Sequence, residues 1–449
     1  MKTIVALSTA NASSAIAMLR LSGTDAVELA STVFVPFSGK KIDTLAGYTA
    51  AYGQFKNEDE IIDDGVTIVY KAPKSYTGEN MAELCCHGNR IIVDKIMAAL
   101  IKNGAVPASA GEFTKRAFFN GKMDLSQAEA VAELISAEGE AAYRGALMRK
   151  SGKLGQQVDS ICDKLLMILS DMGVWADYPE ETDTPFVTYE GLARDLGGAL
   201  QEIRSLCDGY KTGRLMERGI KVAVVGAPNV GKSTLSNVLW ERERSIVTSI
   251  AGTTRDVIEG DITIKGIKIT LLDTAGIREA PDEIEKIGVD RSYKAINDAD
   301  LVLLITDAAR GITMEDRSLL TMAERLPHIV VLNKTDIAPK GEISKLEDTI
   351  SVSALNGDGV EALKAKILEK LEINLSQDTC FIASARQYDC LLRCKKALEE
   401  ALEAVKAKTT FDAVGILLDD AAAPLLELVG KSVSLAVTDK IFERFCVGK

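Results

Sequence analysis

Residues 222–233 read Val-Ala-Val-Val-Gly-Ala-Pro-Asn-Val-Gly-Lys-Ser, and they indicate which fold the middle of the chain adopts. A short apolar run followed by Gly-x-x-x-x-Gly-Lys-Ser is the pattern of a strand, a phosphate-binding loop and the first turn of a helix. The glycines let backbone N–H groups approach phosphate oxygens, and the helix N-terminus favours their charge. We therefore predict that Lys232 reaches the β and γ phosphates and that Ser233 binds Mg²⁺. A glycine-rich turn is the alternative interpretation of an isolated match.

Apolar runs of strand length alternate with helical segments around this loop. They occur at Ile269–Leu272, Leu301–Ile305 and His328–Leu332. Mainly apolar strands that alternate with helices indicate a parallel sheet covered by helices on its faces. The pattern begins at Gly219 and ends near Leu371, so the P-loop lies in an α/β domain of its own.

Two polar segments directly follow such runs, and they indicate guanine as the base. Asp273-Thr-Ala-Gly276 places a carboxylate near the metal and a backbone N–H near the γ phosphate. Asn333-Lys-Thr-Asp336 resembles the motif of translation-factor-related GTPases, in which this Asp pairs with the guanine N1–H and exocyclic amine. A carboxylate fits those two donors and repels the acceptor N1 of adenine. Ser353-Ala354-Leu355 resembles the last guanine-contacting loop of the same proteins.

The residues predicted to bind GTP are Asn229, Val230, Gly231, Lys232, Ser233, Thr234, Thr248, Ser249, Ile250, Ala251, Gly252, Thr253, Thr254, Asp273, Thr274, Ala275, Gly276, Asn333, Lys334, Asp336, Ser353 and Ala354.

Length and composition bound the number of domains and exclude several classes of function. The chain has 449 residues, which at roughly 150 residues per domain predicts about three domains. Its 53 Lys and Arg against 65 Asp and Glu give a net charge of −12, which argues against nonspecific nucleic-acid binding without excluding a local basic patch. Two histidines leave little material for a histidine triad or a zinc site. The longest apolar runs are too short to span a membrane, and the N-terminus lacks the apolar core of a signal peptide. The sequence therefore predicts a cytoplasmic protein, in which the eight scattered cysteines are free thiols.

Changes in sequence texture divide the chain into four segments. Residues 1–118 mix short strand-like runs with Gly and Ser, which is typical of an α+β domain. Residues 119–216 and 375–449 are helical, and the α/β segment 217–374 lies between them. We therefore predict a multidomain α/β protein in which a P-loop domain with a mainly parallel sheet is inserted into a central helical domain.

The position after Gly276 raises a question about hydrolysis. It is Ile277, where Ras-like enzymes place a water-orienting Gln. An apolar side chain can neither donate a hydrogen bond to the attacking water nor accept one. Either hydrolysis is poor or another group orients the water. Asn229 is a candidate cation ligand, with a plain turn residue as the alternative, and Thr248–Thr254 is suited to a mobile switch.

Further motifs resemble the MnmE (TrmE) family of tRNA modification GTPases, which act on the wobble uridine. They are Ser75-Tyr-Thr-Gly-Glu79, Cys86-His-Gly88, Gly111-Glu-Phe-Thr-Lys-Arg-Ala117, Asn120-Gly-Lys-Met-Asp-Leu-Ser-Gln-Ala-Glu129, Gly252-Thr-Thr-Arg-Asp256, Asp273-Thr-Ala-Gly-Ile-Arg278 and Phe445-Cys-Val-Gly-Lys449. The resemblance covers essentially the full length. It implies a homodimeric GTP hydrolase that forms a heterotetramer with the FAD-dependent protein MnmG. Together they would add a carboxymethylaminomethyl (or aminomethyl) group to C5 of uridine 34 in certain tRNAs, with a tetrahydrofolate as one-carbon donor.

The resemblance also assigns roles around the phosphates. It implies a K⁺ ion in place of an arginine finger, with Asn229, Thr248, Ile250 and Thr253 as its ligands. A fixed cation there offsets the charge that develops between the β and γ phosphates. Two G domains must meet to order that loop, so activity depends on dimerisation. Thr254 would join Ser233 on Mg²⁺.

A glutamate matches the residue that orients the attacking water in the family. By this resemblance Glu285 is catalytic, together with Lys232. The alternative for Glu285 is a solvated surface residue, because Asp282, Glu283 and Lys286 surround it.

The N-terminal domain of the family binds 5-formyl- or methylene-tetrahydrofolate and forms the dimer. The matching positions here are Arg20, Glu83, Lys122 and Lys449. A Glu carboxylate can accept hydrogen bonds from the pterin N3–H and amino group, and Arg and Lys suit carboxylates or a formyl oxygen. Taken singly, all four are ordinary surface charges. The chain departs from the family at Thr9–Ala15, which replaces a Pro- and Gly-rich stretch that carries an Arg.

Cys446 matches the proposed reactive thiol of the family, and the basic Lys449 nearby would lower its pKa. The alternative is a small buried hydrophobic residue.

A different class of function also shares the nucleotide motifs. Regulatory or ribosome-assembly GTPases of the Era- and EngA-like type should lack both the folate-type N-terminal segment and the terminal Cys-Val-Gly-Lys. Within the resemblance, the net charge of −12 predicts a tRNA affinity that is weak, localised or supplied by MnmG.

Overall fold

The computed structural model describes residues 2–177, 188–242, 258–273, 292–338, 349–373, 382–443 and 445–448. The chain forms two compact units. The first unit comprises Met1–Ile135, Met148–Ile203 and Cys390–Lys449, and the second comprises Ser136–Leu147 and Arg204–Asp389. The P-loop therefore lies in the second unit, and the chain enters the first unit again after leaving it.

Seven strands form one sheet in the first unit, in the order β3-β4-β5-β6-β2-β1-β7. The strands are β1 (Ile4–Leu7), β2 (Ser14–Ser22), β3 (Phe34–Pro36), β4 (Thr49–Asn57), β5 (Glu60–Tyr70), β6 (Met81–Gly88) and β7 (Val106–Pro107). Neighbouring strands are antiparallel except β1 and β7, which are parallel. This architecture confirms the predicted α+β domain.

Two helices, α1 (Ala26–Val33) and α2 (Arg90–Lys102), pack against this sheet, and the 3₁₀-helix η1 (Ile42–Thr44) packs beside α1. Leu19 and Leu21 of β2 are fully buried in the resulting core. Successive side chains of a strand point to opposite faces, so Arg20 between them points to the other face of the sheet.

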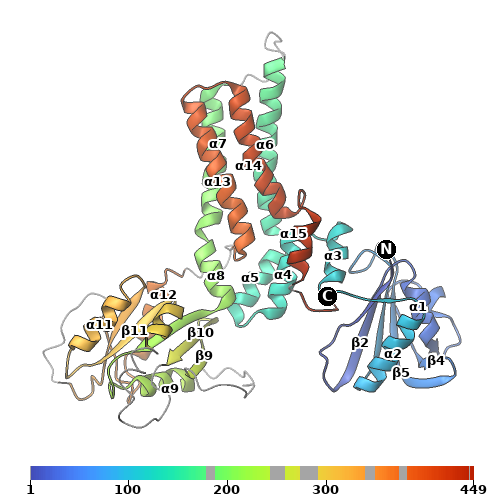
Figure 1. The fold of residues 1–449 in the computed structure, drawn as a ribbon, viewed down its shortest axis with the longest axis horizontal. Helices are drawn as coiled ribbons and strands as arrows, with labels where there is room; N and C mark the ends of the chain where they lie inside the picture. The colour runs from blue at the N-terminus through green and yellow to red at the C-terminus, as the bar shows by residue number, and fades with distance from the viewer. Residues whose placement is uncertain are drawn as a thin grey trace. The chain divides into compact units, whose positions relative to one another are not determined.

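The rest of the first unit is mostly helical. Its helices are α3 (Glu112–Phe119), α4 (Leu125–Ser136), α6 (Lys153–Asp177), α7 (Tyr189–Asp208), α13 (Ala385–Lys406), α14 (Phe411–Val429) and α15 (Leu435–Phe442). Figure 1 shows α6, α7, α13 and α14 running alongside one another as a bundle. The predicted helical domain in two halves is thus present.

The start of α4 is encoded locally. Asp124 Oδ1 accepts a hydrogen bond from the Gln127 N–H (2.7 Å), and Gln127 Oε1 accepts one from the Asp124 N–H (2.9 Å). This reciprocal pair caps the helix N-terminus. The helix ends at Ser136, and Ile135 is therefore 45% exposed despite its apolar spacing.

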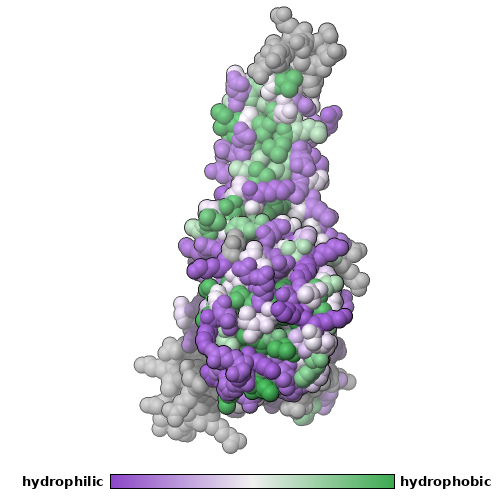
Figure 2. Space-filling view, turned by 90° about the vertical axis from the view of Figure 1, so that its right-hand side faces the viewer, coloured by the Kyte–Doolittle hydropathy of each residue, from purple (hydrophilic) through white to green (hydrophobic). Residues whose placement is uncertain are grey.

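Some apolar side chains of the helices remain on the surface. Figure 2 shows hydrophobic residues along the upper helices. The large exposed ones include Leu166, Met167 and Val174 of α6 and Ile416 of α14. Among the described residues, the longest helices carry too many polar positions for any of them to cross a membrane.

The second unit holds a six-stranded sheet in the order β13-β12-β11-β8-β10-β9. Its strands are β8 (Ile220–Val225), β9 (Ile258–Ile264), β10 (Ile267–Asp273), β11 (Leu301–Asp307), β12 (His328–Asn333) and β13 (Thr349–Ser351). Its helices include α5 (Glu140–Lys150), α8 (Tyr210–Arg218), α9 (Lys232–Arg242), α11 (Met314–Met322) and α12 (Val360–Lys370). Only the β9–β10 pair is antiparallel, which confirms the mainly parallel sheet. The carboxyl ends of the parallel strands meet at one edge, where such sheets bind ligands.

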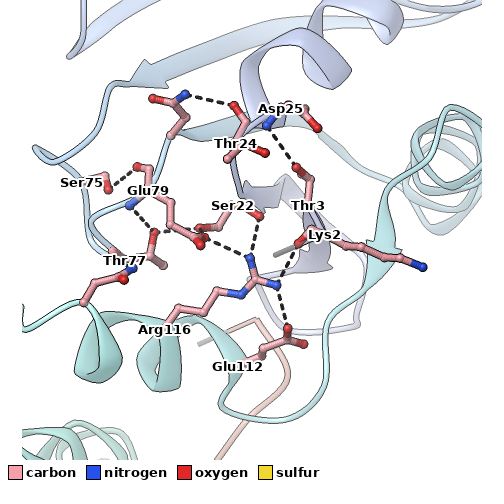
Figure 3. Close-up of polar contacts among 12 residues, drawn as sticks. Lys2, Thr3, Ser22, Thr24, Asp25, Ser75, Thr77, Glu79, Glu112 and Arg116 are labelled. Atoms are coloured by element: carbon pink, nitrogen blue, oxygen red, sulfur yellow. Dashed lines mark hydrogen bonds and ion pairs between the residues drawn. The ribbon is translucent and has the colours of Figure 1, made fainter.

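Two of the family-like motifs meet at one buried arginine (Figure 3). Arg116 of α3 is 5% exposed. Its guanidinium donates to Glu79 Oε2 (3.0 Å) and Glu112 Oε1 (2.9 Å). It also donates to the carbonyl oxygens of Ser22 (3.3 Å) and Lys2 (2.9 Å). These bonds join the first strands, the 75–80 loop and α3.

Both carboxylates around Arg116 are held by further donors. Glu79 Oε2 accepts from the Ser22 hydroxyl (2.7 Å), and Glu112 Oε2 accepts from the Ser109 N–H (2.9 Å). Burial raises the pKa of Glu112, but the Ser109 and Arg116 hydrogen bonds outweigh it and hold that pKa below its ordinary value. Glu112 therefore stabilises the fold in its ionised form, and these motif residues have a structural role.

Candidate nucleotide site and one-carbon site

The P-loop has the geometry that a phosphate cradle needs. β8 ends at Val225, the loop follows, and α9 begins at Lys232. Gly226 and Gly231 have φ of 146° and 96°. A Cβ would lie 2.1 Å from the Ile305 oxygen at Gly226 and 2.3 Å from Asn333 Nδ2 at Gly231, so only glycine fits either position. The predicted strand, loop and helix are confirmed.

The polar residues of this loop surround its opening. Lys232 Nζ donates to the carbonyl oxygens of Gly226 (2.7 Å) and Ala227 (2.9 Å), so the ammonium group lies over the loop. Ser233 and Thr234 are exposed in the first turn of α9. The exposed Asn229 has φ of 63°, the left-handed conformation expected of a turn residue. Val230 is buried beneath the loop.

Asn333 ties two predicted nucleotide-binding segments together. It is the last residue of β12 and is 1% exposed. Its Nδ2 donates to the Val230 carbonyl (2.9 Å), and its Oδ1 accepts from the Ala354 N–H (3.0 Å). The P-loop and the Ser353-Ala354 loop are therefore clamped by one buried amide.

Asp336 lies at the rim of this site and is oriented by Ser353. The Ser353 hydroxyl donates to Asp336 Oδ1 (2.7 Å), and Ser353 is buried while Asp336 is exposed. Within the described residues, Asp336 Oδ2 has no hydrogen bond or ion pair with protein. A positioned carboxylate with a free oxygen suits a base that offers two donors.

Asp307, the last residue of β11, belongs to this site although its sequence context did not predict it. Its Oδ2 lies 2.9 Å from Lys334 Nζ, and its Oδ1 accepts from the Ala309 N–H (2.9 Å). Burial alone would raise the pKa of Asp307, but these hydrogen bonds outweigh that effect and hold the pKa below its ordinary value. The carboxylate therefore stays ionised and fixes Lys334. The available signal was its position at the end of an apolar run, in register with Asn333.

Asp273 ends β10 in register with Val224 of β8, so its backbone lies beside the P-loop strand. The other predicted residues of this site lie outside the described residues: Thr248, Ser249, Ile250, Ala251, Gly252, Thr253, Thr254, Thr274, Ala275, Gly276 and Glu285.

Two of the predicted folate-binding residues form a pair on the N-terminal sheet. Arg20 of β2 and Glu83 of β6 are directly opposite each other, with 2.7 Å between Arg20 Nη2 and Glu83 Oε1. Glu83 Oε2 accepts from the Tyr70 hydroxyl (2.8 Å), and burial followed by this hydrogen bond raises the pKa of Tyr70 to about 12. The Arg20 guanidinium lies 5.8 Å from the ring centroids of both Tyr76 and Phe113. The pair is therefore largely buried and bordered by aromatic rings.

The C-terminal tail reaches this pair from 428 residues away in sequence. The Gly448 carbonyl accepts from Arg20 Nη1 (3.3 Å) and from the Ser8 hydroxyl (3.0 Å). The Cys446 carbonyl accepts from the Gly111 N–H (3.3 Å), and the Cys446 side chain is exposed. The interpretation of Cys446 as a small buried hydrophobic residue is therefore wrong. Lys449 lies outside the described residues.

Lys122 stands apart from this pair. Its ammonium group donates to the Pro73 carbonyl (3.1 Å) and forms a hydrogen bond with neither Arg20 nor Glu83. Of the four predicted folate residues, the structure thus brings together two, places the third on a neighbouring loop and does not describe the fourth.

A glycine-dependent P-loop between β8 and α9, beside an Asp336 carboxylate oriented by Ser353, defines a P-loop GTPase. Two family models match the chain: GTP-binding protein TrmE N-terminus over residues 3–122, and MnmE helical domain over residues 125–446. The chain belongs to the MnmE family of tRNA modification GTPases, and it is a GTP hydrolase that acts in tRNA modification.

Curated relatives match along the whole chain. The tRNA modification GTPase MnmE of Aquifex aeolicus is 40% identical over 99% of both chains. Those of Pseudothermotoga lettingae and Clostridioides difficile are 37% and 38% identical over 100% of this chain and 99% of theirs. A solved variant of Era from Aquifex aeolicus, bound to GDP and AlF4⁻, is 31% identical and covers 40% of this chain and 66% of its own, with a TM-score of 0.28. Full-length matches favour the MnmE family over the Era- and EngA-like alternative.

Proposed function

We propose that this chain is a K⁺-activated, cytoplasmic GTPase that acts with MnmG on wobble uridine 34 of certain tRNAs. The two proteins would add the carboxymethylaminomethyl or aminomethyl group to C5, with a tetrahydrofolate as one-carbon donor. The observation that carries this proposal is the contact of Arg20 with the Gly448 carbonyl, because it brings the Cys446 segment to the Arg20–Glu83 pair. The exposed apolar residues of α6 and α14 support a protein partner such as MnmG or a second copy of this chain.

The nucleotide half of the proposal rests on the cradle around Gly226 and Gly231. The loop N–H groups and Lys232 would bind the phosphates, Asp336 the guanine edge, and Ser233 with Thr254 would hold Mg²⁺. Mg²⁺ supplies charge neutralisation at the β and γ phosphates. Asn229, Thr248, Ile250 and Thr253 would hold K⁺, and Glu285 would orient the attacking water in place of the missing Gln.

The one-carbon half rests on the donors and acceptors of the N-terminal sheet. Glu83 has its charge balanced by Arg20, whose Nε and Nη2 both contact Oε1. Oε2 accepts from the Tyr70 hydroxyl and keeps a lone pair for an N–H group of a pterin. The rings of Tyr76 and Phe113 give the pair an apolar border suited to a flat heterocycle. Lys122 and Lys449 would bind carboxylates of the same ligand, and the exposed Cys446 thiol would be the reactive group.

Deletion of the gene is expected to remove the C5 substituent of wobble uridine, as measured by mass spectrometry of tRNA nucleosides. The wild-type chain should restore it, and Cys446→Ser should not. The matched control is Cys394→Ser, because that thiol is fully buried in the helical bundle. Unchanged modified nucleosides after deletion would reject the proposed function.

Replacement of KCl by NaCl is expected to suppress both GTP hydrolysis and G-domain dimerisation. The smaller ion fits ligands spaced for K⁺ poorly, so the charge between the phosphates is no longer offset. Steady-state phosphate release and analytical ultracentrifugation measure the two effects. Equal rates and equal dimer fractions in both salts contradict the K⁺ assignment.

Glu285→Ala should abolish GTP turnover in KCl while leaving nucleotide affinity nearly unchanged.

A further inference from the structure

Five lysines gather on three loops at one end of the N-terminal sheet. Lys40 and Lys41 precede η1, Lys71 and Lys74 form the turn after β5, and Lys122 follows α3. Hydrogen bonds from two lysine side chains join these loops, and a backbone hydrogen bond closes the turn after β5. Lys71 Nζ donates to the Asp43 carbonyl (3.1 Å), Lys122 Nζ donates to the Pro73 carbonyl (3.1 Å), and the Lys74 N–H donates to the Lys71 carbonyl (2.9 Å). We call these five residues the lysine platform.

Among the residues that the structure describes, no carboxylate neutralises the lysine platform. Within the described residues, none of the five ammonium groups pairs with a carboxylate. The carboxylate of the nearby Glu79 forms an ion pair with Arg116. Elsewhere in the same domain, Lys95 and Lys102 of α2 pair with Glu60 and Glu58. In a chain of net charge −12, a group of unpaired cations is a local attraction for a polyanion.

An exposed tyrosine stands beside these lysines. Tyr48 is 66% exposed, and its N–H donates to the Val69 carbonyl (2.7 Å), two residues before Lys71. Its φ is 61°, a left-handed conformation that costs free energy for a bulky side chain. Its ring meets Tyr70 edge-on at 5.4 Å between centroids. The Tyr48 ring is thus exposed to solvent beside the lysine platform, although its backbone conformation costs free energy.

We propose that the lysine platform and Tyr48 form the surface that binds tRNA. The ammonium groups of Lys40, Lys41 and Lys74 contact backbone phosphates, and Tyr48 stacks on an unpaired base, the combination by which proteins recognise single-stranded loops of RNA. Lys71 and Lys122 hold the loops of the platform through neighbouring carbonyls. Tyr70 links this surface to the one-carbon site, because it touches Tyr48 and donates to Glu83. A base stacked on Tyr48 is then separated from the Arg20–Glu83 pair by the Tyr48 and Tyr70 rings. The identification of the RNA as the wobble-uridine substrate rests on the proposed function.

The test compares two variants that lose the same charge. K40Q/K41Q/K74Q removes lysines of the platform but keeps Lys71 and Lys122, whose ammonium groups hold neighbouring carbonyls. The control, K95Q/K102Q/K396Q, removes three lysines that each face a carboxylate. Binding of fluorescently labelled tRNA to the full chain is measured by anisotropy at several KCl concentrations. The first variant should bind about tenfold more weakly, with a salt slope reduced by about 2 to 3, and the control should resemble the wild type.

The role of Tyr48 is tested in the same assay. Tyr48→Leu should weaken tRNA binding about tenfold, because an aliphatic side chain cannot stack on a base, whereas Tyr48→Phe should retain the wild-type affinity. Equal losses in both lysine variants, equal affinity in all variants, or no measurable binding by the wild type at about 50 mM KCl would each overturn the proposal. GTP hydrolysis should be unchanged throughout. Because binding is measured without the modification chemistry, its failure is distinguishable from a failure of the proposed function.

Discussion

Asp336→Asn is expected to lower the affinity for GTP by about 100-fold or more and to create affinity for xanthosine triphosphate. A carboxylate accepts from both the N1–H and the amino group of guanine. An amide offers one acceptor and one donor, and the donor faces a guanine hydrogen. Xanthine carries a carbonyl oxygen in place of the amino group, so it can accept from the new amide. Titration of fluorescent analogues of both nucleotides measures the exchange.

The control for this exchange is Ser353→Ala. It keeps the carboxylate and removes only the hydroxyl that donates to Asp336 Oδ1. We expect a loss of GTP affinity of about tenfold or less, with no gain for xanthosine triphosphate. If Asp336→Asn bound GTP as the wild type does, Asp336 would not be the residue that selects the base.

Arg116→Met is expected to destabilise the N-terminal sheet and α3 by about 3–5 kcal/mol, because it leaves the Glu79 and Glu112 charges buried without their partner. The side chain is 5% exposed, and the substitution also removes donors from the carbonyl oxygens of Ser22 and Lys2. Hydrogen exchange of the α3 amides reports this effect locally, which is needed because a multidomain chain does not unfold in one step.

Arg144→Met is the matched control for that substitution. Arg144 pairs with Glu140 on the surface of α5, where both side chains are more than half exposed. Water and salt screen such a pair, so its loss should change stability little. GTP binding should survive in both variants, because Arg116 belongs to the unit without the P-loop and Arg144 forms only a solvent-exposed ion pair on α5. Equal hydrogen exchange of α3 in the two variants would refute the structural role of Arg116.

Most of the nucleotide site was predictable from contiguous sequence. The apolar run before Gly226, the glycine spacing and Lys232 are close together along the chain, and local backbone geometry is enough to make them a strand, a loop and a helix. The strand runs that end at Asp273 and Asn333 were predictable for the same reason. Residues that act through distant partners were not. Asp307 is one acidic residue among many until β11 and β12 lie side by side and bring it to Lys334.

The α/β character of the inserted domain, the phosphate-binding loop and the resemblance to a family could be predicted without coordinates, because they depend on periodicity and on spacing within short segments. Three contacts were visible only in the folded protein: Asn333 links two loops, Arg116 joins two motifs of the family, and Arg20 donates to Gly448. The exposure of Cys446 and the position of Tyr48 beside the lysine platform were likewise not predictable. Each of these contacts joins residues far apart in the chain, and their distances are set by how strands and helices pack, which local sequence patterns do not encode.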